Sequence, residues 1–523
     1  MWRWQASRTA VVGVAMAVFV VCCVLPVAYL LTSLIGAHGA YATVLLDARQ
    51  RGLLYNTALL GTGTALLASV IGTLLGIALA RVPLPRKALV RLLLAAPILL
   101  PPYVVGLAWM YLGSGRGLVA ALTGRDLLSD WTYSLPAAIL VLSLVFYPLS
   151  MLATEVAMRR IDGRLEEAAL VVAPEGRVLW RITLPLAAPG IFAAALVIFV
   201  LAVSEFGVPG LLRVRVYTTE VFTAFAALYD FTRAIVLAVP LLLLSVAVAA
   251  AAGALLGDRL VTTRRRTGTR PALLGAWRRP AGAVALIVVS AAVGLPVVIL
   301  VREAMGARSL AAVVGGSGDA IANSLMLATA GATGVVAVAV WLGYARARAR
   351  GLIGRAADIL FIVLFAVPST IVGVGLIGLW NRPGPLGAVY GTDAMFLLAY
   401  LARFVPVAAL ILAASTRYVP LSHEEAAAVS GAGWLRTMSR IVFPQIRLGA
   451  AAAWVIAFVL AFGELGVSIL IAPPGEATLP IRIYTIIANT PSSHVAILAL
   501  LQAVVIFIPL AVLGATTSLR EVR

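Results

Sequence analysis

The sequence predicts an all-helical membrane protein with about twelve spans, arranged as two parallel repeats of six helices. Of its 523 residues, 62% are hydrophobic and 12% are charged, whereas a soluble domain carries about a quarter charged residues. Apolar runs of about 20 residues, long enough to cross a bilayer as a helix, recur from end to end. Segments of the first half also return in the second half, which indicates an internal duplication.

The apolar runs are continuous rather than alternating, so they favour helices over strands of a barrel. The first run, residues 10–34, is longer than the core of a signal peptide, which has about 7–15 residues, and we expect it to be a retained span. The twelve expected spans are centred near Phe19, Ser69, Val104, Leu144, Ile198, Leu244, Val289, Val335, Leu364, Leu410, Ala457 and Val505.

The basic residues orient these spans. With the N-terminus inside, the inner segments hold 28 of the 40 basic residues and the outer loops hold 11, while Arg403 lies within a span. Because inner loops of membrane proteins are enriched in Lys and Arg, both termini are expected in the cytoplasm. The net charge of +19 is spread between spans. It therefore predicts membrane lipid as a partner and excludes a nucleic-acid-binding domain.

Two constant offsets define the duplication. An offset of 267 residues relates Asn56 to Asn323, Arg81 to Arg348, Pro101 to Pro368 and Gly106 to Gly373. Further on, an offset of 259 relates Pro185 to Pro444, Gly190 to Gly449, Glu205 to Glu464 and Gly207 to Gly466. We expect a first repeat at 1–257, a basic cytoplasmic linker at 258–279 and a second repeat at 280–523. Parallel repeats place a transport pathway between the two halves.

Each repeat carries one polar loop with a shared pattern of two glutamates, two alanines, a glycine and a proline. The first, near 165–190, contains Glu166, Glu167, Ala168, Ala169, Gly176 and Pro185. The second, near 423–449, contains Glu424, Glu425, Ala426, Ala427, Gly431 and Pro444. Glu and Ala favour a helix, and Gly permits a sharp turn after it. We expect a helical elbow with an exposed apolar face that binds a protein partner.

This pattern resembles the EAA loop of ABC importer permeases of the type I fold. In that family the loop is a coupling helix that docks in a cleft of the ATP-binding subunit. The resemblance implies a multi-pass protein of the bacterial inner membrane with two ATP-binding subunits on its cytoplasmic side. The first copy departs from the pattern, because Ala173 stands where the second copy has Gly431 and one residue is missing nearby. The two ATPase contacts are therefore expected to be unequal.

The chain itself contains no ATPase motif. A phosphate-binding loop requires a lysine after a glycine-rich run, and the one lysine, Lys87, lies in Pro85-Arg86-Lys87-Ala88. We therefore expect a transport subunit that is not an enzyme and needs no cofactor, with its energy supplied by separate subunits.

Three ionisable residues inside spans are candidate pathway residues. Glu205 and Glu464 occupy equivalent places near the outer ends of their spans, and Arg403 lies in the tenth span. We expect the two glutamates to line the outer pathway and to suit a cationic substrate. The alternative is that each glutamate caps or pairs locally, with Arg403 as one partner. No metal ligands are assigned.

The segments around these glutamates resemble fused iron(III) importer permeases. The resemblance rests on residues 204–208, 217–221, 463–466, 472–475 and 481–484. It implies iron(III) uptake and an extracytoplasmic substrate-binding protein as a partner. Fused thiamine and phosphonate permeases share much of this layout, so these solutes stay open as alternatives.

A different class, an ion-driven secondary transporter, would need an ion site near the midplane. It would also leave the two polar loops unexplained. A membrane-embedded enzyme would need a nucleophile and a base, and the sequence offers no such set.

Overall fold

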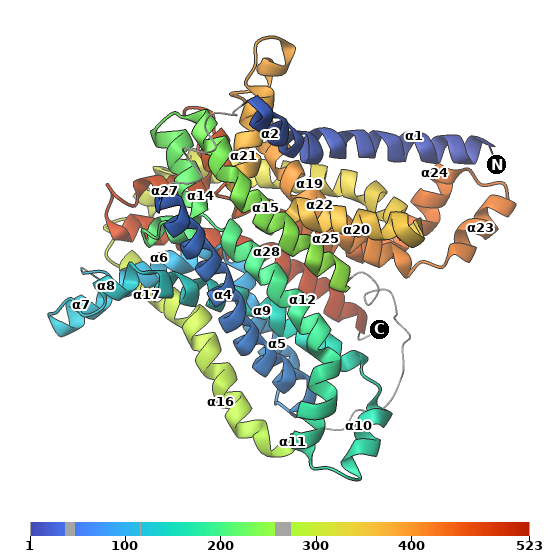
Figure 1. Ribbon diagram of the computed structural model, residues 1–523, viewed down its shortest axis with the longest axis horizontal. Coiled ribbons are helices and arrows are strands. Elements are labelled where there is room, and N and C mark those ends of the chain that lie inside the picture. Colours follow the sequence, from blue (N-terminus) through green and yellow to red (C-terminus); the bar gives the residue numbers. More distant parts are fainter. Residues whose placement is uncertain (1, 37–47, 116, 257–273, 522–523) are drawn as a thin grey trace. The chain divides into compact units, whose positions relative to one another are not determined.

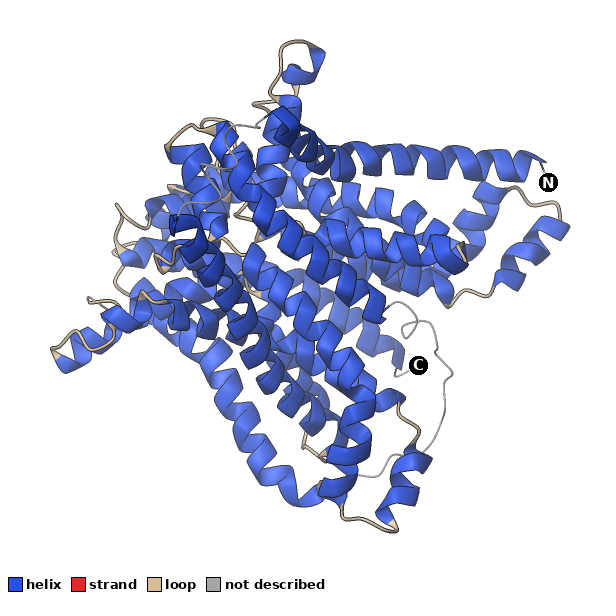
Figure 2. Ribbon diagram, in the orientation of Figure 1, coloured by secondary structure: helices blue, strands red, loops and turns tan. Residues whose placement is uncertain are grey.

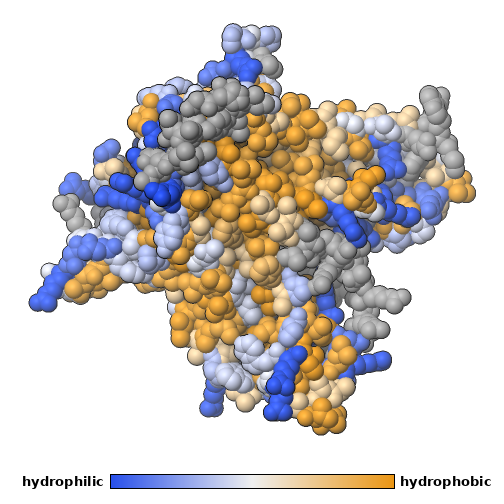
Figure 3. Space-filling model, in the orientation of Figure 1, coloured by the Kyte–Doolittle hydropathy of each residue, from blue (hydrophilic) through white to orange (hydrophobic). Residues whose placement is uncertain are grey.

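The computed structural model describes residues 2–36, 48–115, 117–256 and 274–521. Within these ranges all regular structure is helical (Figure 2). Of the predicted basic linker at 258–279, residues 258–273 lie outside the described part. Hydrophobic residues dominate the visible face of the long helices (Figure 3), as bilayer-facing surfaces require.

Eleven helices of the described part are long and apolar enough to cross a membrane. The number is twelve if α20 (Gly351–Ala366) and α21 (Ser369–Trp380), which meet at an angle of 92°, form one broken span. Pro368 lies at the break, where a proline disfavours helical geometry in the residue before it. The predicted all-helical membrane fold with about twelve spans in two halves is confirmed.

The helices gather into two compact units, here called unit A (46–220 and 240–307) and unit B (1–45, 221–239 and 308–523). Two helices cross the division, α14 (Tyr217–Phe222) and α15 (Phe231–Leu256). The other helices of unit A are α4 (Ala48–Arg81), α5 (Lys87–Ala95), η2 (Ala96–Leu99), α6 (Pro102–Gly113), α7 (Leu118–Thr123), α8 (Ser129–Thr132), α9 (Leu135–Arg160), α10 (Gly163–Leu170), α11 (Glu175–Val178), η3 (Leu179–Thr183), α12 (Leu184–Ser204), α13 (Gly207–Leu211), η5 (Gly275–Trp277), α16 (Arg278–Val289), η6 (Ser290–Gly294) and α17 (Leu295–Ala304).

Unit B is built in the same way around different helices. Besides α20 and α21 it contains α1 (Trp2–Phe19), η1 (Val20–Val24), α2 (Leu25–Gly36), η4 (Thr223–Ala227), α18 (Leu310–Gly315), α19 (Gly318–Arg348), η7 (Pro385–Ala388), α22 (Ala394–Arg417), α23 (Leu421–Val429), α24 (Trp434–Thr437), η8 (Met438–Val442), α25 (Phe443–Phe462), α26 (Ser468–Ile471), α27 (Leu479–Ile486) and α28 (Ser492–Glu521).

The first helices of each predicted repeat pack on the other repeat. In unit B, α1 contacts α19 and α2 contacts α21, although α1 and α2 belong to the first repeat. In unit A, α16 contacts α4 and α5, although α16 belongs to the second repeat. The compact units therefore differ from the repeats of the sequence by an exchange of their leading spans and by residues 221–239, which belong to unit B.

Close helix crossings position the polar loops in both units. In unit A, a Cβ on Gly76 of α4 would lie 2.7 Å from the Met151 carbonyl oxygen of α9. In unit B, a Cβ on Gly343 of α19 would lie 3.0 Å from the Ala409 carbonyl oxygen of α22. Small residues let membrane helices approach this closely. Each crossing lies five residues before an arginine, Arg81 or Arg348, that reaches the following polar loop.

Candidate functional site

Each predicted loop forms a helical elbow. The first elbow comprises residues 163–183, in which α10 is followed by a turn, then α11 and η3. The second elbow comprises residues 421–442, with α23, a turn, α24 and η8 in the same order. In Figure 1, α10 and α11 lie at the opposite end of the long helices of unit A from α7 and α8.

The first glutamate of the first elbow points inward. Glu166 Oε1 lies 2.6 Å from Arg81 Nη2, and both side chains are 0% exposed. The same arginine nitrogen donates to the Met158 carbonyl oxygen at 3.1 Å. Thr183, in η3, donates its hydroxyl to Glu166 Oε1 at 2.8 Å. These bonds join α10 to α4 and η3, while Arg81 Nη1 and Glu166 Oε2 are buried without a hydrogen-bond partner among the described residues. Further hydrogen bonds offset part of the desolvation cost of a pair buried to this degree.

The second elbow holds its first glutamate in a related way. Glu424 Oε1 forms an ion pair with Arg348, which also donates to the Val419 carbonyl oxygen at 3.1 Å. Glu424 Oε2 accepts a hydrogen bond from the Tyr344 hydroxyl at 2.7 Å. The Trp434 indole of α24 donates to the Tyr344 oxygen at 3.4 Å. This network binds both arms of the elbow to α19.

The remaining residues of the shared loop pattern differ in their exposure to solvent. Glu167 and Glu425 are exposed, as are Ala168 and Ala426, whereas Ala427 is buried and Ala169 is half-buried. Pro185 and Pro444 are the second residues of α12 and α25, which continue directly from η3 and η8. The buried and exposed members of each Glu-Glu pair therefore have different environments.

The two turns differ in their glycines. Gly431 has a φ of +77°, a conformation that other residues adopt only at a cost. Gly176 is not at the turn that the sequence indicated, because it lies inside α11. The first turn consists of residues 171–173 and contains no positive φ. The residue missing from the first elbow is lost from its helix, because α10 has 8 residues and α23 has 9. The first connection reaches Pro174, the N-cap of α11, without the left-handed residue that the second one contains.

Apolar side chains remain uncovered on both elbows. Val171 is 84% exposed in the first elbow and Val429 is 90% exposed in the second. Trp180 and Leu435 are also exposed. Such side chains next to exposed glutamates give each elbow a surface suited to a protein partner.

The predicted pathway glutamates make local contacts. Glu205 follows the last residue of α12, and its Oε1 accepts the Gly207 amide at 2.9 Å. Glu464 Oε1 accepts the Val467 amide at 3.0 Å. Because α12 has 21 residues, Glu205 lies about 30 Å along the helix from the first elbow. Both glutamates therefore cap the backbone at the helix ends far from the elbows.

Arg403 accompanies only one of them. Its Nε lies 3.1 Å from Glu464 Oε2, and both side chains are largely buried. Its Nη1 is buried without a hydrogen-bond partner among the described residues. Pro148 in α9 and Pro406 in α22 are equivalent positions. Three residues before each proline, the first half has Val145 where the second half has Arg403. Among the described residues, no group of three His, Cys, Asp or Glu side chains is placed to hold a metal ion.

The sequence analysis missed a second pair of ionic clusters. In unit A, Glu155 is buried and bonds to Arg91 and Arg159, each at 2.5 Å. In unit B, Asp358 bonds to Arg346, and Arg417 Nη2 lies 3.7 Å from it.

The duplication contains the signal for these clusters. At the offset of 267, Arg91 is equivalent to Asp358, so this position reverses its charge. Arg159 is equivalent to Arg417 at an offset of 258, which also relates Pro148 to Pro406. Each unit therefore builds a carboxylate with two arginines from different helices.

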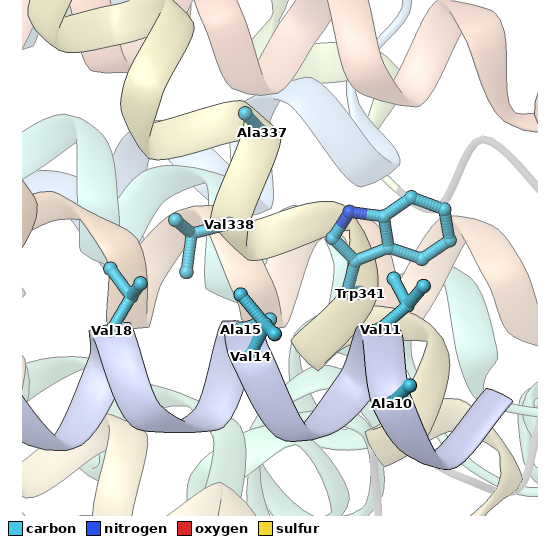
Figure 4. Close-up of a pocket in the computed structure, with 8 residues that line it drawn as sticks. All are labelled: Ala10, Val11, Val14, Ala15, Val18, Ala337, Val338 and Trp341. Carbon is cyan, nitrogen blue, oxygen red and sulfur yellow. The ribbon is translucent and has the colours of Figure 1, made fainter. Parts of the chain in front are cut away.

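A cavity of about 370 Å³ lies between α1 and α19 in unit B (Figure 4). Its lining is entirely apolar apart from one indole nitrogen: Ala10, Val11, Val14, Ala15, Val18, Ala337, Val338 and Trp341. A groove of this composition offers no ligand for an ionic solute.

Comparison with known proteins agrees with this architecture. The family model described as "Binding-protein-dependent transport system inner membrane component" matches residues 68–261 and 335–516. Putative ABC transporter permease protein ORF1 of Streptomyces antibioticus is 32% identical over 218 residues, 40% of this chain and 90% of that protein. Fe(3+)-transport system permease protein FbpB 2 of Haemophilus influenzae is 24% identical over 448 residues, 83% of this chain and 84% of that protein.

Molybdenum transport system permease protein ModB of Escherichia coli is 34% identical over 135 residues, 25% of this chain and 57% of that protein. The family model covers both halves, each half carries one elbow, and the helices are those of a multi-pass inner-membrane protein. The chain therefore belongs to the family of binding-protein-dependent transport system inner membrane components, and it is the non-catalytic permease subunit of an ABC importer.

Proposed function

We propose that this chain forms the whole transmembrane pathway of an importer for iron(III). The observation that carries the proposal is the presence of two elbows with matching buried glutamates in one chain. The similarity to the Haemophilus influenzae Fe(3+) permease extends over 83% of the chain and thus over both halves. One chain then supplies what two separate permease subunits would otherwise supply.

Two ATP-binding subunits dock on the elbows from the cytoplasmic side, and both termini lie on that side. The exposed apolar residues Val171 and Val429, beside Glu167 and Glu425, support this role. ATP binding draws the two elbows together, and the spans change from inward-open to outward-open. A loaded extracytoplasmic binding protein docks at the opposite end, and ATP hydrolysis resets the cycle.

The glutamates at the outer helix ends favour a cation. In this proposal Glu205 and Glu464 line the outer pathway. Arg403 neutralises Glu464 before substrate arrives, because an ionised carboxylate in a low-dielectric setting requires a compensating charge. A trivalent cation would take over that role as it passes.

A second candidate substrate is an oxyanion such as molybdate. It is favoured by the 34% identity to the Escherichia coli molybdenum permease over 135 residues. Arg403 is also a suitable group, since its buried Nη1 donor has no described partner and guanidinium groups bind oxyanions well. Thiamine and phosphonate remain further alternatives.

Uptake into proteoliposomes separates these substrates. The importer would be reconstituted with its ATP-binding subunits and binding protein, then supplied with radioactive iron(III) or radioactive molybdate. We expect ATP-dependent uptake of iron only, and a clear reduction when Glu205→Gln and Glu464→Gln are combined. Uptake of molybdate but not iron, or full iron uptake by the double variant, would refute the iron assignment.

A further inference from the structure

Two hydroxyl groups reach the buried glutamates of the elbows from different parts of the fold. Thr183 donates to Glu166 Oε1 at 2.8 Å, and Tyr344 donates to Glu424 Oε2 at 2.7 Å. All four side chains are buried. Hydrogen bonds to a charged, buried acceptor are among the stronger ones in proteins.

The duplication shows that these hydroxyls are alternatives. Val442 occupies the place of Thr183 in the second half, at the offset of 259. Ile77 occupies the place of Tyr344 in the first half, at the offset of 267. Each half therefore has one hydroxyl and an apolar residue where the other half has its hydroxyl.

The two arrangements restrain different parts. Thr183 belongs to η3, so its bond ties the far arm of the first elbow to α10. Tyr344 belongs to α19, so its bond ties α23 directly to the helix bundle of unit B.

An aromatic cluster strengthens the second arrangement. The Trp434 ring lies 5.9 Å from the Tyr344 ring and 5.5 Å from the Trp341 ring. Arg8 of α1 lies over the Tyr344 ring at 5.7 Å. In the first half, Leu74 and Glu175 stand at the places of Trp341 and Trp434. The second elbow is thus fixed to two helices of its bundle, α19 and α1. The first elbow is joined to α4 through Arg81 and to its own far arm through Thr183.

We propose that Thr183 and Tyr344 are positioning residues for energy coupling, each holding a buried glutamate and thereby setting the angle of its elbow. The inference rests on the proposed docking of ATP-binding subunits on the elbows. Because the restraints differ, the second elbow moves with its bundle as one body, and the first elbow turns more freely about its junctions with α9 and α12.

Hydrogen exchange of the full chain in lipid nanodiscs tests the proposal without any partner. Tyr344→Phe should make the amides of α23 exchange about tenfold faster or more, because one strong hydrogen bond is lost. The amides of α10, α22 and α25 should keep their rates. Adding Val442→Thr places in the second half the hydroxyl that Thr183 supplies in the first half. It should return the exchange rate of the α23 amides to within about threefold of the original value.

The equivalent substitutions in the first half provide the matched control. Thr183→Val should accelerate exchange in α10 and leave α23 unchanged, and adding Ile77→Tyr should slow α10 again. The proposal is overturned if Tyr344→Phe leaves α23 unchanged, if it accelerates α22 and α25 equally, or if Val442→Thr fails to restore the rate.

Coupling supplies a readout that a purely structural role would not move. In the importer assembled with its ATP-binding subunits, Tyr344→Phe should increase the ATP hydrolysed per solute severalfold, with the KM for MgATP unchanged. Adding Val442→Thr should restore the ratio, and an unchanged ratio in Tyr344→Phe would overturn the proposal. Failure of iron uptake with the expected exchange pattern would refute the substrate and leave this inference intact.

Discussion

The first elbow and the second elbow share an arginine–glutamate pair but surround it differently. In the first, Arg81 and Glu166 are both fully buried and Thr183 adds a hydrogen bond to Glu166. In the second, the Arg348 side chain is 13% exposed, and Tyr344 and Trp434 complete the network. The duplicated fold thus retains the ion pair that orients the elbow while the supporting groups diverge.

The largest expected effect is on the ion pair of the first elbow. Arg81→Met leaves Glu166 buried without its charge partner, which should cost about 3–5 kcal/mol. Arg348→Met should cost less, since the Arg348 and Glu424 side chains are 13% and 3% exposed, whereas Arg81 and Glu166 are fully buried. Heat-induced loss of folded protein, followed by size-exclusion chromatography in detergent, measures both. The double variant Arg81→Met/Glu166→Leu should recover part of the loss, and equal effects of the two arginine variants would remove the proposed difference.

The two ionic clusters should also differ in how much stability they contribute. Here the larger loss is expected in the second half. Asp358→Asn leaves Arg346 largely buried without a carboxylate and should cost about 3 kcal/mol. Glu155→Gln should cost about 1 kcal/mol, because Arg91 and Arg159 reach solvent. The same thermal assay compares them, and a larger loss for Glu155→Gln would contradict the exposure argument.

The turns should respond to glycine exchange in opposite ways. Gly431→Ala forces an alanine to a φ of +77°, which should cost about 1–2 kcal/mol and reduce ATP-driven uptake. Ala173→Gly relaxes a turn that needs no positive φ, and it should change stability by under about 1 kcal/mol. Uptake by reconstituted importer is the measurement. Normal uptake by Gly431→Ala would show that the second turn adopts another conformation.

The smallest effect on folding is expected at the exposed glutamates. Glu167→Ala and Glu425→Ala should each change stability by less than about 0.5 kcal/mol, since neither side chain is buried. Both variants should retain less ATP-binding subunit during copurification. Unchanged retention in the double variant would mean that the docking surface lies elsewhere on the elbows.

Much of this architecture is visible in the sequence because it depends on local signals. Apolar runs locate the spans, the constant offsets reveal the two halves, and the Glu-Glu-Ala-Ala pattern locates α10 and α23. The repeat even marks Arg81 and Arg348 as equivalent positions. Their role stays hidden, because each arginine bonds to a glutamate 85 or 76 residues further along the chain.

Other features depend on tertiary packing and have no local signal. The exchange of leading spans between compact units requires knowledge of which helices touch. Gly176 misleads because its neighbours resemble a turn, whereas α11 begins at Glu175 with Pro174 as its N-cap. Thr183 and Tyr344 look like ordinary residues of helix ends, and only their distance to a buried carboxylate distinguishes them.

The mass of the intact importer tests the central claim most directly, namely that one chain supplies two elbows for two ATP-binding subunits. Native mass spectrometry of the complex, purified in detergent with its ATP-binding subunits, counts the copies of each chain. We predict one copy of this chain with two ATP-binding subunits. A complex that contains two copies of this chain, or one copy with a single ATP-binding subunit, would contradict the account.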